Sequence, residues 1–453
     1  MHSLDVMPIG EGDEFNNAGA VVYIDAEARR RHLVVLGGSG SGKSTMLRNM
    51  IAWDIDSGEG VSVIDPHGQL VEDTIGHHIP RRRTNDVIYL NPKDPAVAVA
   101  INLLDCPRPE LRGLVVANVL AVFKRYWPDA FAAGARMEDI IRNSLFALVE
   151  QPEPVSIVAV PKLLTDSGYR AEVLRAVTNA GVLDFFHSQF NTWPPAFRAE
   201  AISSVLNKFR AFTTDPMLRA IVGQARSSFS FREALDARQI ILCDLAEGLI
   251  GRDNARLLGS LIVVQEQLAC ASRADIKEEE RVPHFLYAEE APTFVGDFGS
   301  IFTGSRKFAL YLTLVAQSAE MLTDEDISAM FNSAGGLISF RVSGADAERL
   351  KKEFGQVSPG VALGDLHELK DRRAYVRRLI CDEHGCEPGQ PERIATYAPL
   401  KSRNVEWRSA IERASNHVYA RPRSIVDREI GRFIRKRYPQ PEESTKAKRK
   451  RKK

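Results

Sequence analysis

A run of nine residues, Gly37–Thr45 with the sequence GGSGSGKST, constrains the fold of this chain more than any other feature. Gly37, Gly42, Lys43 and Ser44 occupy the defined positions of G-x-x-x-x-G-K-[ST], the phosphate-binding loop, without a mismatch. Glycine lets the backbone curl so that several N–H groups face one anion, and no Cβ atom blocks the approach. The lysine adds a positive charge for the β- and γ-phosphates, and the serine adds a hydroxyl for Mg²⁺.

The residues around this loop follow the pattern that it requires. His32–Leu36 is a short, mostly apolar run before the loop, as expected for a buried parallel strand. After the loop, apolar residues recur at helical spacing at Met46, Leu47, Met50, Ile51 and Ile55. A strand, a glycine loop and an amphipathic helix in this order predict a nucleoside triphosphate site. Its predicted binding residues are Gly37, Gly38, Ser39, Gly40, Ser41, Gly42, Lys43, Ser44 and Thr45.

Two adjacent carboxylates are the best candidates for the chemistry of hydrolysis. Phe285–Ala288 is an apolar run, and Glu289 and Glu290 follow it directly. Hydrolysis needs one carboxylate that organises the metal and a second group that polarises the attacking water. We therefore expect Glu289, together with Ser44, to hold the Mg²⁺ and Glu290 to act on water. An exposed acidic pair is the alternative, and the apolar run before it argues against that interpretation.

A cation and an amide are also expected near the γ-phosphate. Arg306, with Lys307 beside it, follows the acidic pair by the length of a loop and a helix, and a cation here would stabilise developing charge. A plain surface salt bridge is the alternative for this arginine. Gln317 follows the apolar run Leu310–Ala316 and is predicted to sense the γ-phosphate or orient water. Arg341, after a later apolar run, is the second candidate for the cation.

The rest of the chain predicts an α/β fold. Short apolar runs alternate with long segments of helical periodicity, which favours a mostly parallel sheet. We expect residues 1–109 to form the first part of the nucleotide-binding domain, with N-terminal strands, and residues 236–400 to form its second part, ending in a hairpin. Strand signals are scarce in residues 110–235, which predicts an inserted all-helical domain. Residues 401–453 are expected to form a C-terminal helix and a basic tail.

Charge and hydropathy limit the surroundings in which the chain can work. A formal net charge of +1 provides no overall field that attracts nucleic acid. The basic run Lys446–Lys453 is either a solvated tail or an arm for nucleic acid or acidic lipid. No secretion signal and no apolar stretch of the roughly 20 residues needed for a membrane span is visible. We expect a cytoplasmic protein, and a partner must hold it if it works at the inner face of a membrane.

The cysteines favour a reducing compartment. The chain contains 5 cysteines, an odd and scattered set, which argues against a disulfide scaffold. Cys381, His384 and Cys386 lie close together in the sequence and raise the alternative of a zinc site. Their spacing is not that of a zinc finger and no second cluster exists, so a hairpin turn is the favoured interpretation.

The motifs together resemble a known family. Leu33–Thr45, Ile64–Gly68, Leu286–Glu290, Arg306–Lys307 and Ala316–Gln317 are similar in kind and order to motifs of the HerA/FtsK superfamily of ATP-driven pumps. Within that superfamily they look most like the TraD/TraG-type coupling ATPases of conjugative type IV secretion. The resemblance covers about residues 20 to 400.

The resemblance implies a RecA-like P-loop NTPase domain with an inserted all-helical domain, and a homo-hexameric ring that drives DNA through its pore. ATP and Mg²⁺ are the implied cofactors, and a relaxase or membrane secretion-channel proteins are implied partners. By position, Glu289 falls at the Walker B aspartate and Glu290 at the catalytic glutamate. Arg306 falls at a proposed arginine finger that acts on the neighbouring subunit's nucleotide, and Gln317 falls at the sensor glutamine.

The sequence departs from the family in two ways and leaves other functions open. Glu289 stands where the family usually has aspartate, which leaves the alternative of a slow, nucleotide-dependent binder. The membrane-spanning N-terminal segment of many coupling proteins is not seen. A soluble HerA-like helicase that acts with a nuclease, and a secretion ATPase that handles protein, are therefore the two alternatives to a conjugative DNA pump.

Overall fold

The computed structural model describes residues 6–13, 17–106, 108–132, 134–295, 301–354, 366–382, 385–401 and 407–439. The chain divides into two compact units, Met1–Lys93 with Ser230–Tyr419 and Asp94–Phe229 with Ala420–Lys453. The basic run Lys446–Lys453 lies outside the described residues. Among the residues that the structure describes, no helix is both long and apolar enough to cross a membrane.

One sheet forms the centre of the first unit. Its strands are β1 (Val6–Gly12), β2 (Val21–Asp25), β3 (Leu33–Leu36), β4 (Gly60–Asp65), β5 (Val87–Leu90), β7 (Ile240–Asp244), β8 (His284–Ala288), β9 (Leu310–Ala316), β10 (Gly336–Ser339), β11 (Arg373–Asp382), β12 (Gly385–Pro388) and β13 (Glu392–Thr396). They are ordered β2-β1-β13-β11-β10-β3-β9-β8-β4-β7-β5, and β12 pairs with β11. From β10 to β5 neighbouring strands pair parallel, which confirms the predicted α/β fold with a mostly parallel sheet.

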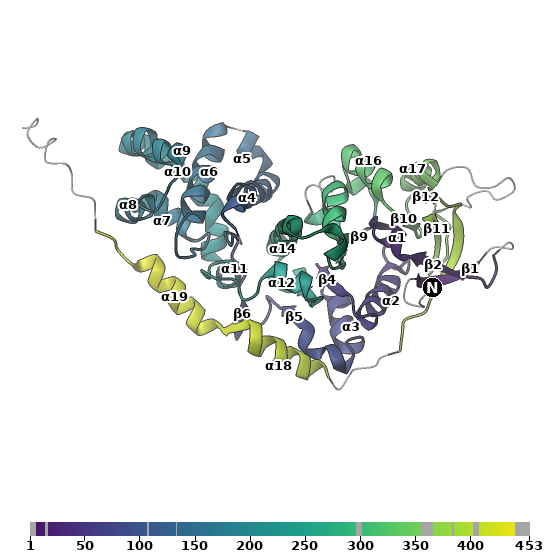
Figure 1. The fold of residues 1–453 in the computed structure, drawn as a ribbon. Coiled ribbons are helices and arrows are strands. Elements are labelled where there is room, and N and C mark those ends of the chain that lie inside the picture. Colours follow the sequence, from purple (N-terminus) through teal and green to yellow (C-terminus); the bar gives the residue numbers. More distant parts are fainter. Residues whose placement is uncertain are drawn as a thin grey trace, which may run out of the picture. The chain divides into compact units, whose positions relative to one another are not determined.

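Helices cover both faces of this sheet. They are α1 (Ala26–Arg29), α2 (Lys43–Asp56), α3 (Gln69–His77), α12 (Phe231–Asp236), α13 (Glu247–Ile250), α14 (Arg252–Ser272), α16 (Asp324–Ser333), α17 (Gly344–Phe354) and α18 (Arg408–Tyr419). Figure 1 shows α2 and α3 on one side of β4 and α14 on the other. Every residue of the central strands β3, β4, β8 and β9 is buried, as expected for parallel strands covered on both faces.

The parallel register brings the ends of distant strands together. Leu36 at the end of β3 pairs with Ala316 at the end of β9, and Ile64 of β4 pairs with Ala288 at the end of β8. The residues that follow these strand ends are the phosphate-binding loop, Gln317 and the acidic pair that starts at Glu289. They therefore lie along one edge of the sheet, which is called the carboxyl edge below.

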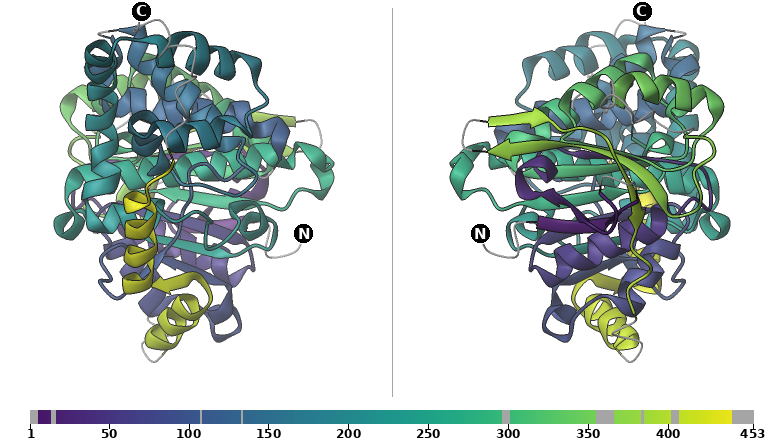
Figure 2. Two further views of the ribbon diagram at one scale, coloured as in Figure 1. Left: turned by 90° about the vertical axis from the view of Figure 1, so that its left-hand side faces the viewer. Right: turned by 90° about the vertical axis from the view of Figure 1, so that its right-hand side faces the viewer.

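The antiparallel part of the sheet joins both ends of the first unit. β1 pairs with β2 and with β13, and β11 pairs with β10 and β13. The right-hand view of Figure 2 shows these N-terminal strands in purple beside the yellow-green strands of the C-terminal part. Gly10 is required at one contact, because a Cβ atom there would lie 2.4 Å from the carbonyl oxygen of Ala395.

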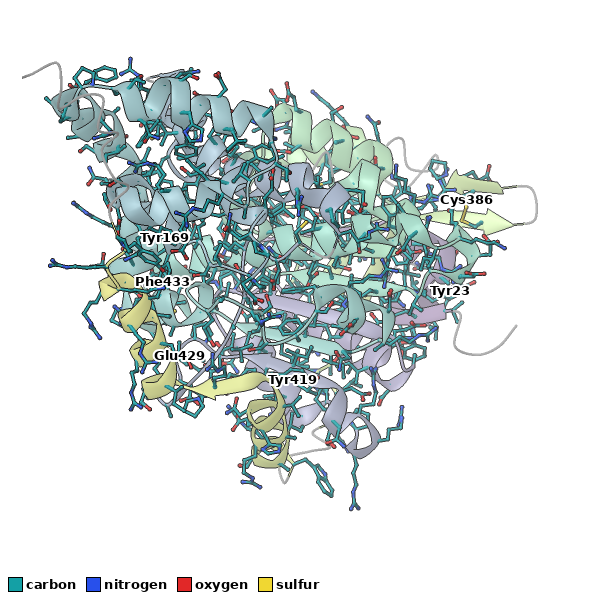
Figure 3. The ribbon with its side chains drawn as sticks, turned by 60° about the vertical axis from the view of Figure 1, so that its left-hand side comes forward. Tyr23, Tyr169, Cys386, Tyr419, Glu429 and Phe433 are labelled. Carbon is teal, nitrogen blue, oxygen red and sulfur yellow. A yellow bond between two sulfur atoms is a disulfide. The ribbon has the colours of Figure 1, made fainter. Side chains whose placement is uncertain are left out.

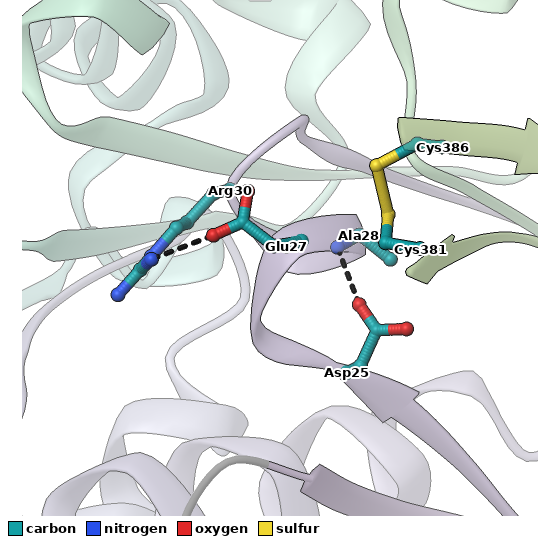
Figure 4. Close-up of a disulfide and its surroundings, with 6 residues drawn as sticks. All are labelled: Asp25, Glu27, Ala28, Arg30, Cys381 and Cys386. Atoms are coloured by element: carbon teal, nitrogen blue, oxygen red, sulfur yellow. Dashed lines mark hydrogen bonds and ion pairs between the residues drawn. A yellow bond between two sulfur atoms is a disulfide. The ribbon is translucent and has the colours of Figure 1, made fainter. Parts of the chain in front are cut away.

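A disulfide that the sequence analysis does not predict joins Cys381 to Cys386 (Figure 4). These cysteines are directly opposite each other in the β11–β12 pairing, with Cα atoms 4.0 Å apart. The hairpin interpretation of this segment agrees with the β11–β12 pairing, but a spacing of five residues does not by itself show that the two cysteines are opposite each other. Among the described residues no group of three or more His, Cys, Asp or Glu side chains could hold a metal ion, and His384 lies outside them.

A buried ion pair ties α1 and α2 to β8. The carboxylate of Asp54 in α2 accepts hydrogen bonds from Arg29 at 2.5 and 2.6 Å and from the Tyr287 hydroxyl at 2.6 Å. The guanidinium of Arg29 also lies 4.0 Å from the centre of the Phe285 ring. Because α2 begins at the phosphate-binding loop, this cluster holds the helix that carries the loop against the strand that carries the acidic pair.

We expect Asp54→Ala to lower the free energy of unfolding by about 3–5 kcal/mol, because Arg29 keeps a buried charge without its partner. Urea denaturation measures this loss. The double variant Arg29→Met with Asp54→Leu is expected to lose less, since it removes both charges. Glu27→Ala is the matched control: it breaks the exposed pair with Arg30, whose atoms lie 2.7 Å apart and which Figure 4 draws, and is expected to cost about 0.5 kcal/mol or less. Equal losses in the single and the double variant would contradict this electrostatic account.

The second unit is mostly helical. Its helices are α4 (Arg112–Tyr126), α5 (Pro128–Ala132), α6 (Ala135–Val149), α7 (Ala159–Thr165), α8 (Ser167–Leu174), α9 (Ala180–Asp184), α10 (Pro195–Thr214), α11 (Pro216–Val222) and α19 (Arg423–Arg435). β6 (Val97–Val99) and β14 (Ala420–Pro422) pair antiparallel. Val426 and Ile430 of α19 join the same apolar cluster as Val158 and Ala220. In Figure 3, Phe433 of α19 lies beside Tyr169 of α8, with ring centres 5.7 Å apart, so α19 packs as part of this unit.

Candidate nucleotide-hydrolysis site

The phosphate-binding loop connects β3 to α2 and is held at its start by neighbouring strands. The N–H groups of Gly37 and Gly38 donate to the carbonyl oxygens of Ala316 and Arg341, at 3.2 and 2.7 Å. Gly42 caps α2 with φ at 113°, a left-handed conformation that favours glycine. No side chain caps α2, so the N–H groups of its first turn remain available to an anion.

Lys43 points back into the loop. Its ammonium donates to the carbonyl oxygens of Gly37 and Gly38. Burial lowers the pKa of Lys43, and the charges of Glu289 and Glu290 act in the opposite direction. The ammonium therefore lies between the loop and the acidic pair, where a β- or γ-phosphate oxygen is expected to bind.

Ser44 and Glu289 meet, as expected for ligands of one metal ion. The Ser44 hydroxyl donates to Oε1 of Glu289 at 2.7 Å. Burial, followed by the charge of Asp65, raises the pKa of Glu289 to about 7, and the bond from Ser44 partly offsets this rise. Hydroxyl and carboxylate oxygens are the ligands that Mg²⁺ prefers, so these residues fit that ion. The longer side chain of glutamate, compared with aspartate, spans the distance to Ser44.

Asp65 at the end of β4 has a structural task. Its carboxylate accepts the backbone N–H groups of His67, Leu70 and Val71 at 2.9, 2.7 and 3.1 Å. These bonds satisfy the free donors at the start of α3 and fix the turn that carries His67. Asp65 therefore orders the carboxyl edge through the backbone.

Glu290 lies between an amide and an imidazole. Its backbone is left-handed, with φ at 50°, and its carbonyl accepts the N–H and hydroxyl of Thr293 at 2.9 and 2.8 Å. Oε1 accepts a hydrogen bond from the amide of Gln317 and lies 3.0 Å from Nε2 of His67. Burial lowers the pKa of His67, but the hydrogen bond and charge of Glu290 outweigh burial and raise it overall. The described contacts hold Oε1, which leaves Oε2 as the oxygen to polarise water.

Arg306 lies at the opposite edge of the sheet from Glu290. It belongs to a short turn, Arg306–Phe308, that comes directly before β9, whereas Gln317 follows the same strand. A strand of 7 residues separates the two by roughly 20 Å at about 3.3 Å per residue. Arg306 lines a pocket of about 730 Å³ with residues that precede other strands, such as Glu59 and Pro283. It is therefore too far away to reach the phosphate-binding loop of its own chain.

Two other arginines lie beside the loop. Arg341 accepts the Gly38 N–H with its carbonyl and pairs with Asp371 at 3.0 Å. The backbone N–H of Arg372 donates to the carbonyl of Ser41 at 2.8 Å. Arg372 has φ at 61°, and its Cα lies 3.1 Å from the position of a Cβ on Gly42. Its exposed side chain has no ion-pair partner among the described residues. Arg341, the second candidate for an arginine finger, therefore lies at the chain's own loop.

Most of the residues predicted from the sequence lie together here, and two further side chains lie beside them. Glu289, Glu290, Gln317 and the loop meet at one edge, as the order of strand ends predicts. His67 belongs to the motif Ile64–Gly68, yet no role was predicted for its imidazole. No role was predicted for Arg372 either, because its position beside the loop depends on the β10–β11 pairing.

Comparisons with known proteins find relatives in part of the sequence and in the fold. Residues 9–121 match the family described as "Helicase HerA, central domain". No curated protein matches the chain. The bacterial conjugative coupling protein TrwBdeltaN70, in its unbound form, is 17% identical with a TM-score of 0.58, over 85% of this chain and 88% of that chain. VirB4 of Thermoanaerobacter pseudethanolicus is 15% identical with a TM-score of 0.52, over 86% of this chain and 96% of that chain.

These findings confirm the resemblance that the motifs suggest. The chain has the fold of the TrwB coupling protein, a RecA-like α/β fold. It resembles P-loop ATPases of the HerA/FtsK type, which include the TraD/TraG-type proteins. The family match includes the loop Gly37–Thr45 and the turn that carries His67.

We expect Arg372→Ala to weaken nucleotide binding about tenfold, because a cation held beside the loop is lost from the anion site. Titration with a fluorescent ATP analogue measures the dissociation constant. Arg373→Ala is the matched control, since the next arginine pairs with Asp13 at 2.7 Å. Equal affinity in the Arg372→Ala variant and the wild type would show that this arginine does not contact the nucleotide.

Proposed function

We propose that this protein is a Mg²⁺-dependent ATPase that translocates DNA as a subunit of a hexameric ring. The observation that carries the proposal is the meeting of Ser44 with Glu289, and of Gln317 with Glu290, at the edge that bears the phosphate-binding loop. These pairs provide a metal-binding set and a water-polarising set beside one anion site. TrwB was solved with ADP and Mg²⁺ and with a non-hydrolysable ATP analogue, which supports the same cofactors here.

Each side chain has a distinct part in this proposal. The N–H groups at the start of α2 and the ammonium of Lys43 bind the phosphates. Ser44 and Glu289 would hold Mg²⁺, which neutralises charge on the phosphate oxygens when bound. Oε2 of Glu290 takes a proton from the attacking water, while Gln317 holds Oε1 and thereby sets the direction of the carboxylate. Arg372 adds positive charge next to Gly42.

The position of Arg306 supports a ring. Because it lies at the sheet edge opposite its own Glu290, it can assist hydrolysis only at the site of another copy. In a head-to-tail contact, the edge of one sheet that carries Arg306 and its pocket would face the carboxyl edge of the next chain. Such a contact would bring Arg306 of one chain to Glu290 of the next. Repeating one such contact closes a ring when the rotation permits, and the resemblance suggests six copies.

DNA and the secretion machinery are the proposed partners. The fold shared with a conjugative coupling protein and with VirB4 supports a role in type IV secretion or conjugation. A relaxase or membrane secretion-channel proteins would then place this cytoplasmic ATPase at the inner face of the membrane. The match to the HerA central domain supports the second candidate, a soluble DNA translocase that acts with a nuclease.

We expect ATP hydrolysis by the wild type to rise at least about fivefold with DNA. Lys43→Ala and Glu290→Gln are each expected to reduce turnover about a hundredfold or more, since each removes a group that acts on the transferring phosphate or on water. A steady-state phosphate-release assay with single- and double-stranded DNA measures both effects. Robust ATP turnover that is the same with and without DNA would favour protein as the translocated substrate.

Mixing of two inactive variants tests whether Arg306 acts between copies. Arg306→Ala and Lys43→Ala are each expected to be nearly inactive alone, since an arginine finger raises turnover by about 10³-fold or more. In an equal mixture, about a quarter of the contacts join an intact loop to an intact arginine, so activity is expected to return to about that fraction. Mixing Lys43→Ala with Glu290→Gln is the control, because both changes damage the same edge. A mixture of the first pair that stays inactive would contradict action in trans.

A further inference from the structure

The loop between β7 and α14 is bound to the turn that carries His67. The N–H groups of Leu245 and Glu247 donate to the carbonyl oxygens of Asp65 and Pro66, at 3.0 and 2.7 Å. Gly68 is required at this contact, because a Cβ there would lie 2.5 Å from Oδ1 of Asp244. The backbones of the two segments are therefore fixed to each other at their bases.

The tip of the same loop is open to solvent. Leu249 is 75% exposed, and the side chain of Arg252 is 69% exposed. Gly251, with φ at 86°, joins this tip to α14, of which Arg252 is the first residue. A loop with a fixed base and an open tip can report an outside contact to the residues at its base.

A row of charged side chains connects this tip to Glu290. Nε of Arg252 lies 3.8 Å from Oε2 of Glu247, and Oε1 of Glu247 lies 3.7 Å from Nδ1 of His67. Nε2 of the same imidazole lies 3.0 Å from Oε1 of Glu290. His67 thus has one ring nitrogen toward each carboxylate, and Arg252 and His67 share the charge of Glu247 through its two oxygens.

We propose that His67 is a positioning residue that transmits polyanion binding at Arg252 to Glu290 through Glu247. When a phosphate binds Arg252, the carboxylate of Glu247 loses its interaction with that arginine and attracts the imidazole of His67 more strongly. The imidazole then moves its interaction from Glu290 toward Glu247. Glu290, no longer paired with that ring, becomes a better acceptor for the proton of water. The loop is thereby the element that senses the polymer.

This inference rests on the proposed function, because it assigns to Glu290 the role of acting on water and to DNA the role of the polyanion. It adds the residue that senses the polymer and the route by which the signal arrives. Loss of a simple DNA contact at Arg252 would leave turnover without DNA unchanged. The relay from Arg252 through Glu247 and His67 to Glu290 instead predicts that removing Arg252 raises turnover without DNA. Removing this cation has the same effect on Glu247 as binding of the cation to a phosphate.

The test is turnover of Arg252→Ala with and without double-stranded DNA. We expect its kcat without DNA to rise about fivefold, with the KM for ATP unchanged and with most of the stimulation by DNA lost. The double variant Arg252→Ala with Glu247→Gln is expected to return to the low basal kcat, because no carboxylate then draws the imidazole away. Arg413→Ala and Glu200→Gln, exposed residues on α18 and α10, are the matched controls for the two charge changes and are expected to behave as the wild type.

The outcomes separate the relay from the DNA motor. A basal kcat of Arg252→Ala equal to that of the wild type overturns the relay, whether or not DNA stimulates the wild type. A gain that persists in the double variant also overturns it, since the signal would then bypass Glu247. A gain that depends on Glu247 in a protein that DNA does not stimulate supports the relay and contradicts DNA as the polymer.

Discussion

The parallel register of β3, β9, β8 and β4 determines where the proposed catalytic side chains Glu289, Glu290 and Gln317 lie. A shift of β9 by one residue along β3 would move Gln317 along the edge and turn the side chains of β9 to the opposite faces of the sheet. The same pairing also supplies the carbonyl of Ala316 that anchors Gly37. Strand pairing therefore builds the site and holds the phosphate-binding loop at once. The buried Asp54 cluster adds a second connection, because it joins the helix after the loop to β8.

Most of the fold and much of the site could be predicted because the evidence is local in the sequence. Phe285–Ala288 is recognisable as a strand without knowledge of its neighbours. Glu289 and Glu290 follow this strand directly, so the end of the strand determines their position. The carboxyl ends of parallel strands share one edge, so separate strand ends predict one site. Arg306, which was expected near the γ-phosphate, comes before β9 and therefore lies at the opposite edge of its own sheet.

The remaining features depend on pairings between distant segments or on backbone angles. Arg372 reaches the phosphate-binding loop because β11 runs antiparallel to β10 and therefore begins at the carboxyl edge. The presence of an arginine in the sequence does not predict its φ of 61°, and the presence of a glutamate does not predict the φ of 50° at Glu290. Non-glycine residues in this region cost of order 1 kcal/mol or more, so the surrounding bonds must hold them there. The Cys381–Cys386 bond and the packing of α19 in the second unit were missed for the same reason, since each depends on which segments meet.

The separation of Arg306 from Glu290 across one sheet has a genetic consequence for a ring of the proposed kind. Each site would draw on two chains, so a chain with a damaged Arg306 would silence the intact site of its neighbour. Damaged and intact chains made in one cell would assemble together. Each damaged chain would keep its own loop and Glu290 and would silence one site, that of its neighbour, so the loss of activity would follow the fraction of damaged chains.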